Sequence, residues 1–202
     1  MEDQGKNIFS NFNDILNRQE KEKFIKQRSK VIWLTGLSGS GKSSIANLLE
    51  RNLYYEGYIC MLLDGDNIRS GINNNLDFSE EGRKENIRRI AEVSKLFMNC
   101  GIITINSFIS PTKEIRNLAR NIIGSDNFVE VFVNTPLEIC EERDVKGLYK
   151  KARAGMIKNF TGIDSRFEAP DNPDIELHTK DCTVEESSIE LYNFVKPMIK
   201  CN

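Results

Sequence analysis

The stretch of sequence that decides the fold is VIWLTGLSGSGKSS, residues 31–44. Its first five residues are a β-branched and aromatic run, the composition of a buried strand. The eight residues 36–43, GLSGSGKS, match the phosphate-loop pattern G-x-x-x-x-G-K-[ST] in full. Apolar residues then recur at helical spacing from Ile45 to Leu53. A strand before the loop and a helix after it are the context that separates a phosphate loop from a flexible glycine-serine linker.

In such a loop the backbone N–H groups converge on a polyphosphate at the N-terminus of a helix, where the helix dipole favours anions. We expect Lys42 to meet the β- and γ-phosphates of a nucleoside triphosphate, and the Ser43 hydroxyl to ligate Mg²⁺. The predicted nucleotide-binding residues of the loop are Gly36, Leu37, Ser38, Gly39, Ser40, Gly41, Lys42, Ser43 and Ser44.

The rest of the chain alternates between strand and helix patterns. Further strands are predicted at 58–63, 102–106, 128–134 and 175–178, and helices at 79–99, 112–122, 137–142 and 184–199. This alternation predicts an α/β three-layer fold of the P-loop kinase type, with a mostly parallel five-stranded sheet and helices on both faces. Ligands of such sheets bind beyond the carboxyl ends of the strands. Residues 1–29 are expected to form a polar N-terminal arm with a short amphipathic helix, and residues 30–202 the P-loop domain.

Composition narrows the function classes. The chain has 202 residues, 39% of them hydrophobic, and a formal net charge of −2. No general nucleic-acid partner is expected, because phosphate-tracking domains carry a strongly basic face. No membrane association is expected either, since no apolar run approaches about 20 residues. The five cysteines are scattered, and the N-terminus has no apolar signal core, so we expect a reduced, cytoplasmic protein.

A basic segment late in the chain distinguishes among phosphate-loop proteins. GTPases read their base through an N-K-x-D stretch, which is absent, and no apolar run ends in the lone aspartate that many ATPases use as a second metal site. Residues 143–162 instead carry six basic side chains against one acidic, with glycines available as hinges. A solvated helical face is the simpler interpretation of a charge run. In a phosphate-loop protein, however, this segment is typical of a kinase lid that covers the transferring phosphate and excludes water.

The stretch CMLLDGDNIRSG, residues 60–71, ends an apolar run in two aspartates around a glycine. An acidic turn is the simple interpretation, because aspartate and glycine favour turns. However, Asp64 and Asp66 follow the second predicted strand, at the edge of the sheet where ligands bind. Their carboxylates are therefore also candidates for a metal ligand and a proton acceptor. We expect Asp64 to hold Mg²⁺ through water and Asp66 to accept a proton or orient the acceptor hydroxyl, with Gly65 serving the turn. The sequence leaves open the exchange of these two roles between the carboxylates.

Taken together, seven motifs resemble the adenylylsulfate kinase family. They run in the same order from about residue 31 to the C-terminus: TGLSGSGKSS, LLDGDNIRSGI, LDFSEEGRKENIRR, SFISP, RDVKGLYKKARAG, FTGID and FEAPDNPDIEL. The phosphate loop alone would be unspecific, whereas DGDNIR followed by FS-x-x-x-R-x-x-N and FISP is particular to that family. The resemblance implies transfer of the γ-phosphoryl group of ATP to the 3′-hydroxyl of adenosine 5′-phosphosulfate (APS), which yields 3′-phosphoadenosine 5′-phosphosulfate and ADP.

The resemblance also implies site residues. Arg69 would neutralise the phosphosulfate, Phe78 would stack on the acceptor adenine, and Arg143 and Cys182 would lie near the ATP adenine. Ser110 matches the serine described as a phosphoserine intermediate, although in-line transfer needs no covalent intermediate; it could also bind the acceptor or cap a helix. The implied catalytic residues are Ser110, Asp66 and Lys42. The implied acceptor-binding residues are Asp66, Asn67, Ile68, Arg69, Phe78, Arg83, Asn86, Ile109, Ser110, Lys146, Asn159 and Phe160.

Two other functions remain open at the level of sequence. Another small-molecule kinase, with a nucleotide or sugar-acid acceptor, would share the loop and the lid. A non-catalytic ATP-binding module that regulates a partner would keep Lys42 and Ser43 but lose the acceptor residues. The segments TKEIRN and DSRFEAP, with Phe167 at an aromatic position, depart from the family pattern. The family resemblance implies a homodimer, and the chain length suggests a stand-alone kinase without a sulfurylase domain.

Overall fold

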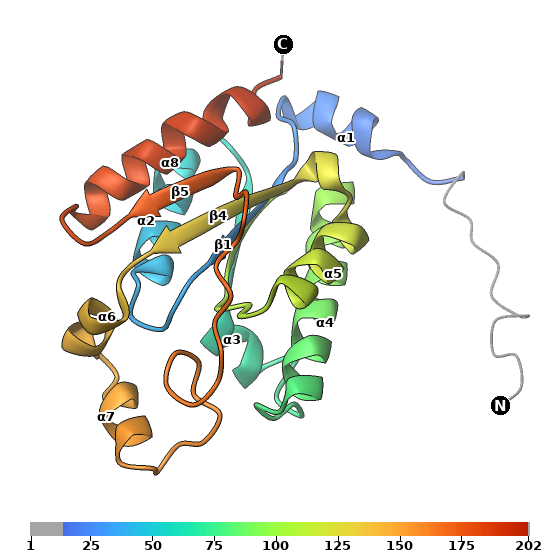
Figure 1. Cartoon of the computed structure of the whole chain (residues 1–202). Coiled ribbons are helices and arrows are strands. Elements are labelled where there is room, and N and C mark those ends of the chain that lie inside the picture. The colour runs from blue at the N-terminus through green and yellow to red at the C-terminus, as the bar shows by residue number, and fades with distance from the viewer. Residues whose placement is uncertain (1–13, 202) are drawn as a thin grey trace, which may run out of the picture.

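The computed structural model describes residues 14–201, and none of the helices in this range is long and apolar enough to cross a membrane. Five strands form one sheet in the order β2-β3-β1-β4-β5, and every neighbouring pair is parallel. The α/β fold predicted from the sequence is confirmed (Figure 1). The strands are β1 (Val31–Thr35), β2 (Cys60–Asp64), β3 (Ile103–Ser107), β4 (Phe128–Asn134) and β5 (Ile175–His178).

Helices cover both faces of this sheet. The main ones are α2 (Lys42–Tyr55), α4 (Glu80–Asn99), α5 (Lys113–Ile123) and α8 (Val184–Ile199). Helices α2 and α8 pack together on one face, while α4 and α5 pack together on the other (Figure 1). The shorter elements are α1 (Arg18–Ile25), α3 (Gly65–Ser70), the 3₁₀ turn η1 (Ser125–Asn127), α6 (Leu137–Arg143) and α7 (Leu148–Arg153).

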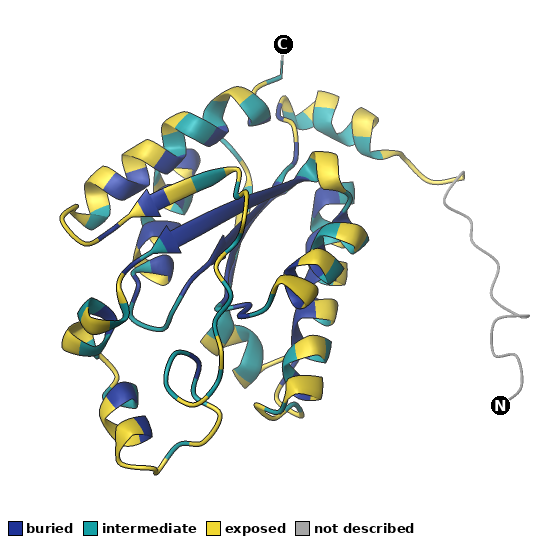
Figure 2. Ribbon diagram, in the orientation of Figure 1, coloured by how far each residue is buried: buried dark blue, intermediate teal, exposed yellow. Residues whose placement is uncertain are grey.

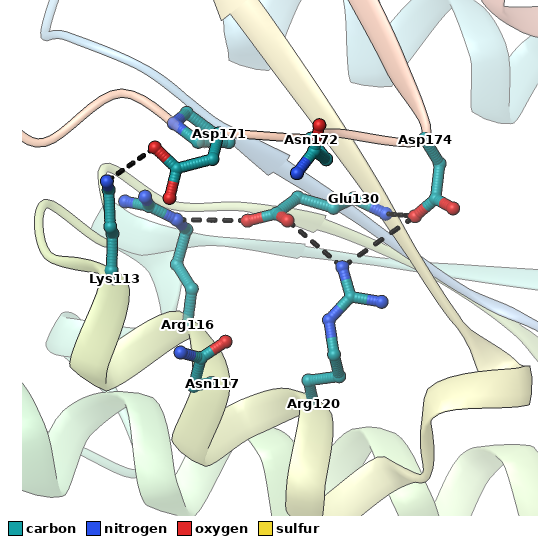
Figure 3. Close-up of a pocket in the computed structure, with 9 residues that line it drawn as sticks. Lys113, Arg116, Asn117, Arg120, Glu130, Asp171, Asn172 and Asp174 are labelled. Atoms are coloured by element: carbon teal, nitrogen blue, oxygen red, sulfur yellow. Dashed lines mark hydrogen bonds and ion pairs between the residues drawn. The ribbon is translucent and has the colours of Figure 1, made fainter.

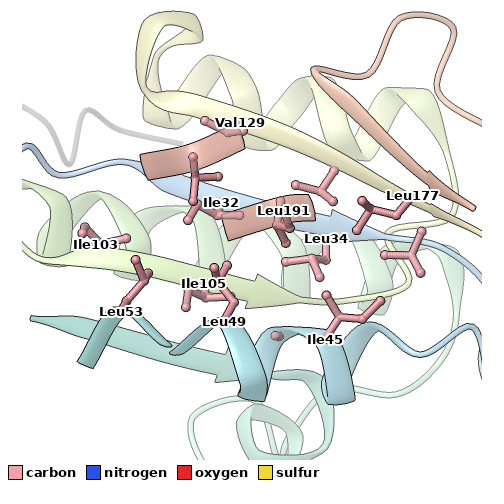
Figure 4. Packing of buried hydrophobic residues seen from close by; sticks show 14 of the residues in the cluster. Ile32, Leu34, Ile45, Leu49, Leu53, Ile103, Ile105, Val129, Leu177 and Leu191 are labelled. Atoms are coloured by element: carbon pink, nitrogen blue, oxygen red, sulfur yellow. The ribbon is translucent and has the colours of Figure 1, made fainter. Parts of the chain in front are cut away.

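The core divides at the sheet because successive strand residues point to opposite faces. In β1, Ile32 and Leu34 enter the cluster under α2 and α8, which Figure 4 shows from close by. Val31 and Trp33 enter the cluster under α4 and α5. All five residues of β1 are buried, as Figure 2 shows for the central strands. Burial on both faces holds the strand that leads into the phosphate loop in place.

Part of the predicted N-terminal arm packs against the sheet domain; residues 1–13 lie outside the described residues. Helix α1 begins after Asn17, whose side chain forms a capping box with Glu20. Gln27 is 1% exposed, and its side-chain amide hydrogen-bonds to the backbone of Ile59 and Gly101. Ile59 precedes β2 and Gly101 precedes β3, so this contact lies at the amino-terminal end of the sheet, opposite the phosphate loop.

Two short helices at the carboxyl-terminal end differ from the sequence-based expectation. The acidic stretch that we interpreted as a turn folds as helix α3, and Asp64 is its N-cap, accepting a hydrogen bond from the Asp66 N–H at 3.1 Å. Gly65 therefore occupies the first helical position instead of a turn. The predicted lid likewise contains helix α7. Both helices have only six residues, too few for a period of 3.6 to become visible in the sequence.

Candidate active site

Three neighbouring strands bring oxygen-bearing side chains together at their carboxyl ends. The phosphate loop follows β1, while Asp64 ends β2 and Ser107 ends β3. The Ser43 hydroxyl donates a hydrogen bond to Asp64 Oδ2 at 2.7 Å, and its oxygen lies 3.2 Å from Ser107 Oγ. The order β2-β3-β1 makes this meeting possible, because residues separated by up to 64 positions in the sequence end adjacent strands.

The phosphate loop is shaped by a glycine that no other residue could replace. Gly36 has φ +151°, and a Cβ there would lie 2.6 Å from the Val133 carbonyl oxygen. Gly41, the N-cap of α2, also has a positive φ (+98°) and provides no side-chain cap for the helix. The first N–H groups of α2 are therefore not capped by a side chain and face the loop, as an anion-binding helix N-terminus requires.

Lys42 has a buried side chain. It is 7% exposed, and its ammonium donates to the Leu37 carbonyl at 2.6 Å and to Ser40 Oγ at 3.3 Å. Burial lowers its pKa to about 8, a shift that the Asp64 carboxylate partly opposes. A buried cation held mainly by neutral oxygens gains from a polyphosphate beside it, because opposite charge restores the stability that desolvation removes.

The oxygen set around Ser43 suits Mg²⁺. Among residues 14–201 no cluster of three or more histidine, cysteine, aspartate or glutamate side chains could hold a metal alone. Mg²⁺ commonly binds through one or two protein oxygens together with water and substrate phosphates. The hydroxyl of Ser43 and the carboxylate of Asp64, which lie in direct contact, fit that kind of site.

Asp66, in the first turn of α3, has a different partner from Asp64. Its carboxylate forms an ion pair with the Lys146 ammonium, which comes from the predicted lid. The two aspartates of DGD thus have separate surroundings: Asp64 contacts the phosphate loop, and Asp66 contacts the lid. Both Asp66 and Lys146 are largely exposed, so this pair spans the site without being buried in it.

Arg69 and Phe78 lie together at the edge of the site. The Arg69 guanidinium lies 4.2 Å from the centroid of the Phe78 ring and donates hydrogen bonds to the carbonyls of Leu76 and Asp77. Phe78 is 61% exposed and is therefore no part of the core. Its open ring face could stack on a base. Arg69, however, uses its hydrogen bonds to hold the loop before α4, a role that sequence reasoning did not anticipate. Asn67 and Ile68 lie beside it in α3.

Helix α4 presents two of the predicted residues on one side. Arg83 donates to Thr161 Oγ1 at 2.6 Å and also to the Asn159 carbonyl, so it ties the helix to the end of the lid. Asn86, one turn later, is 5% exposed and accepts a hydrogen bond from the Asn73 amide at 3.0 Å. Their three-residue spacing places both side chains on the same helix face, as predicted.

The lid is anchored to the phosphate loop by an aromatic residue. The Tyr149 hydroxyl donates to the Ser38 carbonyl at 2.8 Å, and its ring packs edge-on against Phe160 with centroids 5.0 Å apart. Asp164 accepts hydrogen bonds from the Asn159 and Phe160 N–H groups. Although burial raises the pKa of Asp164, these backbone donors lower it overall. Tyr149 therefore ties the first half of the lid to the phosphate loop, and Asp164 holds the backbone at the end of the lid.

The SFISP corner differs from the expectation of a catalytic serine. Ser110 is 2% exposed, and its hydroxyl accepts a hydrogen bond from the Trp33 indole at 3.1 Å. The Ile109 carbonyl accepts from Thr35 Oγ1 at 2.7 Å. The hydroxyl of Ser110 is thus engaged inside the protein, and the residue adopts a left-handed φ of +38°. This geometry fits a structural corner and does not expose the hydroxyl to a transferring phosphate.

Arg116, Arg120 and Glu130 form an ionic cluster next to this corner (Figure 3). Arg116 pairs with Glu130 at 2.9 Å and donates to the Ser110 carbonyl at 2.9 Å and the Glu168 carbonyl at 2.7 Å. Arg120 completes the cluster with a 3.0 Å contact to Glu130. Arg116 thus joins the end of β3, strand β4 and the segment that returns from the lid.

Arg143 and Cys182 lie near the loop that follows β5. The Arg143 guanidinium donates to the Thr179 carbonyl at 2.6 Å, and Thr179 Oγ1 donates to the Ser40 carbonyl at 3.2 Å. Cys182 is exposed and directly precedes the N-cap of α8. This loop therefore contacts the phosphate loop on the side away from Asp64.

Sequence reasoning missed several residues that the structure brings to the site. Ser107 could have been found, because it ends a predicted strand at the same edge as Asp64. Tyr149, Thr161 and Asn73 gave no such signal, since each depends on contacts with residues far away in the sequence or on the path of a loop.

The sequence profile described as adenylylsulphate kinase matches residues 28–178, three quarters of the chain. The chain belongs to the adenylylsulphate kinase family. An adenylyl-sulfate kinase from Bacteroides thetaiotaomicron is 60% identical over 193 residues, which cover 96% of each chain. One from Bacteroides fragilis is 58% identical over 197 residues, which cover 98% of each.

Solved structures agree with the family assignment. The Mycobacterium tuberculosis APS kinase in complex with AMPPNP and APS superposes with a TM-score of 0.80 and 49% identity, covering 84% of this chain and 98% of that one. A gluconokinase from Sinorhizobium meliloti, at 17% identity and a TM-score of 0.58, shares the fold alone. The adenylylsulphate kinase family thus matches in sequence over nearly the whole chain, whereas this gluconokinase matches only in fold.

Proposed function

We propose that the protein transfers the γ-phosphoryl group of ATP to the 3′-hydroxyl of APS, giving 3′-phosphoadenosine 5′-phosphosulfate and ADP. The observation that carries the proposal is the meeting of the phosphate loop with the DGDNIR motif, where Ser43 and Asp64 lie 2.7 Å apart. Membership of the adenylylsulphate kinase family supports the identity of the acceptor.

Positioning and charge do most of the work in phosphoryl transfer. The uncapped N-terminus of α2 and the Lys42 ammonium bind the β- and γ-phosphates and stabilise the charge that develops on the transferring group. Ser43 and Asp64 would hold Mg²⁺, which would supply further neutralisation of phosphate charge. The basic lid then covers the phosphates, and the Tyr149–Ser38 hydrogen bond keeps its base beside the loop.

We assign Asp66 as the group that orients the acceptor 3′-hydroxyl and takes its proton as the O–P bond forms and the bond to ADP breaks. Its present partner, Lys146, is also a predicted acceptor contact. Binding of the acceptor between them would replace this exposed ion pair, which costs little because such pairs contribute about 0–1 kcal/mol. Arg83, Asn86, Phe78 and the Asn159-Phe160 segment complete the proposed acceptor site.

Ser110 has a structural role in this proposal, through both its hydroxyl and its carbonyl. With its hydroxyl bound to Trp33 and its carbonyl to Arg116, it holds the corner at the end of β3 next to the site. Phosphoryl transfer then occurs directly from ATP to APS without a phosphoserine. A Ser110→Ala variant that keeps turnover within a few-fold would support this role; complete loss of turnover with an intact fold would support the covalent one.

A direct test measures Mg²⁺-dependent ADP release from ATP with APS as acceptor, in parallel with AMP, GMP and gluconate. We expect turnover with APS and with none of the other three acceptors. Turnover on one of the other acceptors and none on APS would identify a different small-molecule kinase. Specific ATP binding without any turnover would identify a regulatory module.

The assembly and the surroundings of the protein belong to the same proposal. We propose a homodimer, as the family resemblance implies, to be checked by light scattering of the purified protein. A reduced, cytoplasmic setting is supported by the five cysteines, all of which are free thiols. The division into an arm of residues 1–29 and a domain of residues 30–202 also stays a proposal, with the helical part of the arm packed on the domain.

A further inference from the structure

Asn73 is the most buried polar residue of the loop between α3 and α4. It is 0% exposed, although its neighbours Asn74 and Asn75 are exposed. Its N–H donates to the Ile68 carbonyl at 3.0 Å, which closes the loop behind α3. Its side chain points at α4 and contacts Asn86 there. A buried amide in an otherwise solvated asparagine run calls for a reason beyond loop formation.

Arg89 indicates which way the side-chain amide of Asn73 is oriented. A guanidinium can only donate, so the Asn73 atom that faces Arg89 Nη1 at 3.4 Å has to be the oxygen Oδ1. Arg89 is itself held by Glu85 at 2.8 Å, and its Nη1 also donates to Asn75 Oδ1 at 2.9 Å and to the Ile72 carbonyl at 3.4 Å. With its oxygen committed to Arg89, Asn73 turns its Nδ2 group toward α4.

The orientation of the Asn73 amide in turn determines the orientation of the Asn86 amide. Asn73 Nδ2 donates to Asn86 Oδ1 at 3.0 Å and approaches the Asn86 backbone carbonyl at 3.5 Å. The oxygen of Asn86 is thereby used, and the amide cannot rotate by half a turn without placing two donors against each other. Asn86 Nδ2 donates to no other described residue and is not sealed from solvent. It lies on the helix face that also carries Arg83.

We propose that Asn73 is a positioning residue for the phosphoryl acceptor, which acts by fixing the Asn86 amide so that its N–H₂ group faces the acceptor site. The site then offers a hydrogen-bond donor, beside the Arg83 cation, to an acceptor atom of APS. Phosphosulfate oxygens and unprotonated adenine nitrogens are atoms of this kind. The inference rests on the proposed function for the identity of the ligand, but the orientation of Asn86 rests on the contacts alone.

The first test is Asn73→Asp, because aspartate has the same shape as asparagine and its carboxylate can only accept. The introduced carboxylate would accept from both Arg89 and Asn86 Nδ2, so the Asn86 amide would turn and present its oxygen to the acceptor. We expect the KM for APS to rise about ten- to one-hundredfold, as for the loss of one well-placed hydrogen bond to a ligand. The KM for ATP should stay within twofold. An unchanged KM for APS would overturn the proposal.

A matched control and a double variant separate positioning from loop stability. Asn75→Asp places the same charge on the same loop opposite the same guanidinium, but Asn75 does not contact Asn86, so the KM for APS should not change. In an Asn86→Ala background, Asn73→Asp should have no further effect on that KM. A rise with Asn75→Asp, or a further rise in the Asn86→Ala background, would show that Asn73 acts through the loop and would overturn the proposal.

A second variant keeps the test decisive if Asn73→Asp does not fold. Asn86→Asp retains the hydrogen bond from Asn73 and offers an oxygen where Asn86 offers N–H₂, so it should raise the KM for APS at least as much as Asn86→Ala. Normal APS binding by Asn86→Asp would contradict a donor role. The unaltered protein is assayed first: absence of APS turnover there would refute the proposed function, whereas APS turnover with unaffected variants would refute only the role of Asn73.

Discussion

At the scale of single residues, the site contains a buried lysine, Lys42, whose charged form is disfavoured by burial. The lowered pKa of Lys42 reports that the folded protein without nucleotide holds this ammonium at a cost, which burial imposes. Stability and function therefore pull in opposite directions at this position, as is common in sites prepared for a charged ligand. The same residue should reveal both effects on substitution.

Lys42→Met should lower kcat by a factor of about 10² or more, because the transition state loses a charge-assisted contact in a site that excludes water. The thermal midpoint of the nucleotide-free protein should not fall, since methionine fills the same space without a buried charge. Steady-state ADP release and a thermal melt measure the two quantities. Near-normal kcat would refute the role of Lys42, and a large drop in the thermal midpoint would refute the account of its burial.

The two aspartates of DGD should respond differently to amidation. Asp64→Asn weakens the oxygen set shared with Ser43, so the Mg²⁺ concentration for half-maximal turnover should rise several-fold. Asp66→Asn removes the proposed proton acceptor, so kcat at saturating Mg²⁺ should fall by about 10²-fold or more. Titrating Mg²⁺ in the ADP-release assay with both variants checks this. The reverse pattern would exchange the two roles.

At the scale of elements, the sequence predicted those parts that depend on local pattern. The strand into the phosphate loop, the helix capped by Ser79 and the helix opened by Pro136 were expected and are found. Helices α3 and α7 were missed because six residues show no period. The Ser43–Asp64 contact followed from strand ends meeting at one edge, whereas the Arg83–Thr161 contact joins a helix to a lid whose path no sequence pattern specifies.

Helix α4 carries an acidic residue whose pairing sets a pH dependence. Hydrogen bonds first from Arg88 and then from Arg89 lower the pKa of Glu85 from 4.5 to about 2. A carboxylate with a lowered folded-state pKa stabilises the fold above its unfolded value, and this contribution is lost as the pH falls from about 4.5 toward 2. The Glu85 side chain is 34% exposed, so water screens both ion pairs and the contribution should stay below about 1 kcal/mol.

Glu85→Gln should therefore lower the free energy of unfolding slightly at pH 7, and the difference from the unaltered protein should shrink at pH 3.5. Urea unfolding at both pH values measures this difference. Glu138→Gln, on the surface of α6 and outside every ion pair among the described residues, provides the control and should show no pH-dependent difference. A difference for Glu85→Gln that grows on acidification would contradict the assigned sign of the pKa shift.

At the scale of the whole molecule, the proposed site lies at one end of the parallel sheet and the contact with the N-terminal arm lies at the other. The carboxyl ends of the strands carry the phosphate loop, both aspartates and the lid. The amino ends are closed by α1 and by Gln27, far from any proposed catalytic group. Because the sheet between them is buried on both faces, changes at the amino end should alter stability without altering the site.

Gln27→Ala tests this separation. It removes hydrogen bonds to Ile59 and Gly101 at 2.8 Å and takes this partner from the Ile59 N–H and the buried Gly101 carbonyl, which should cost about 1–3 kcal/mol in the free energy of unfolding. The KM for ATP and APS should each stay within twofold, because no contact of Gln27 reaches the strand ends that hold the site. Gln19→Ala, at an exposed glutamine of α1, should change neither quantity. A Gln27→Ala variant with unchanged stability would show that α1 is not held by this contact, and one with a changed KM would show that the two ends of the sheet are coupled.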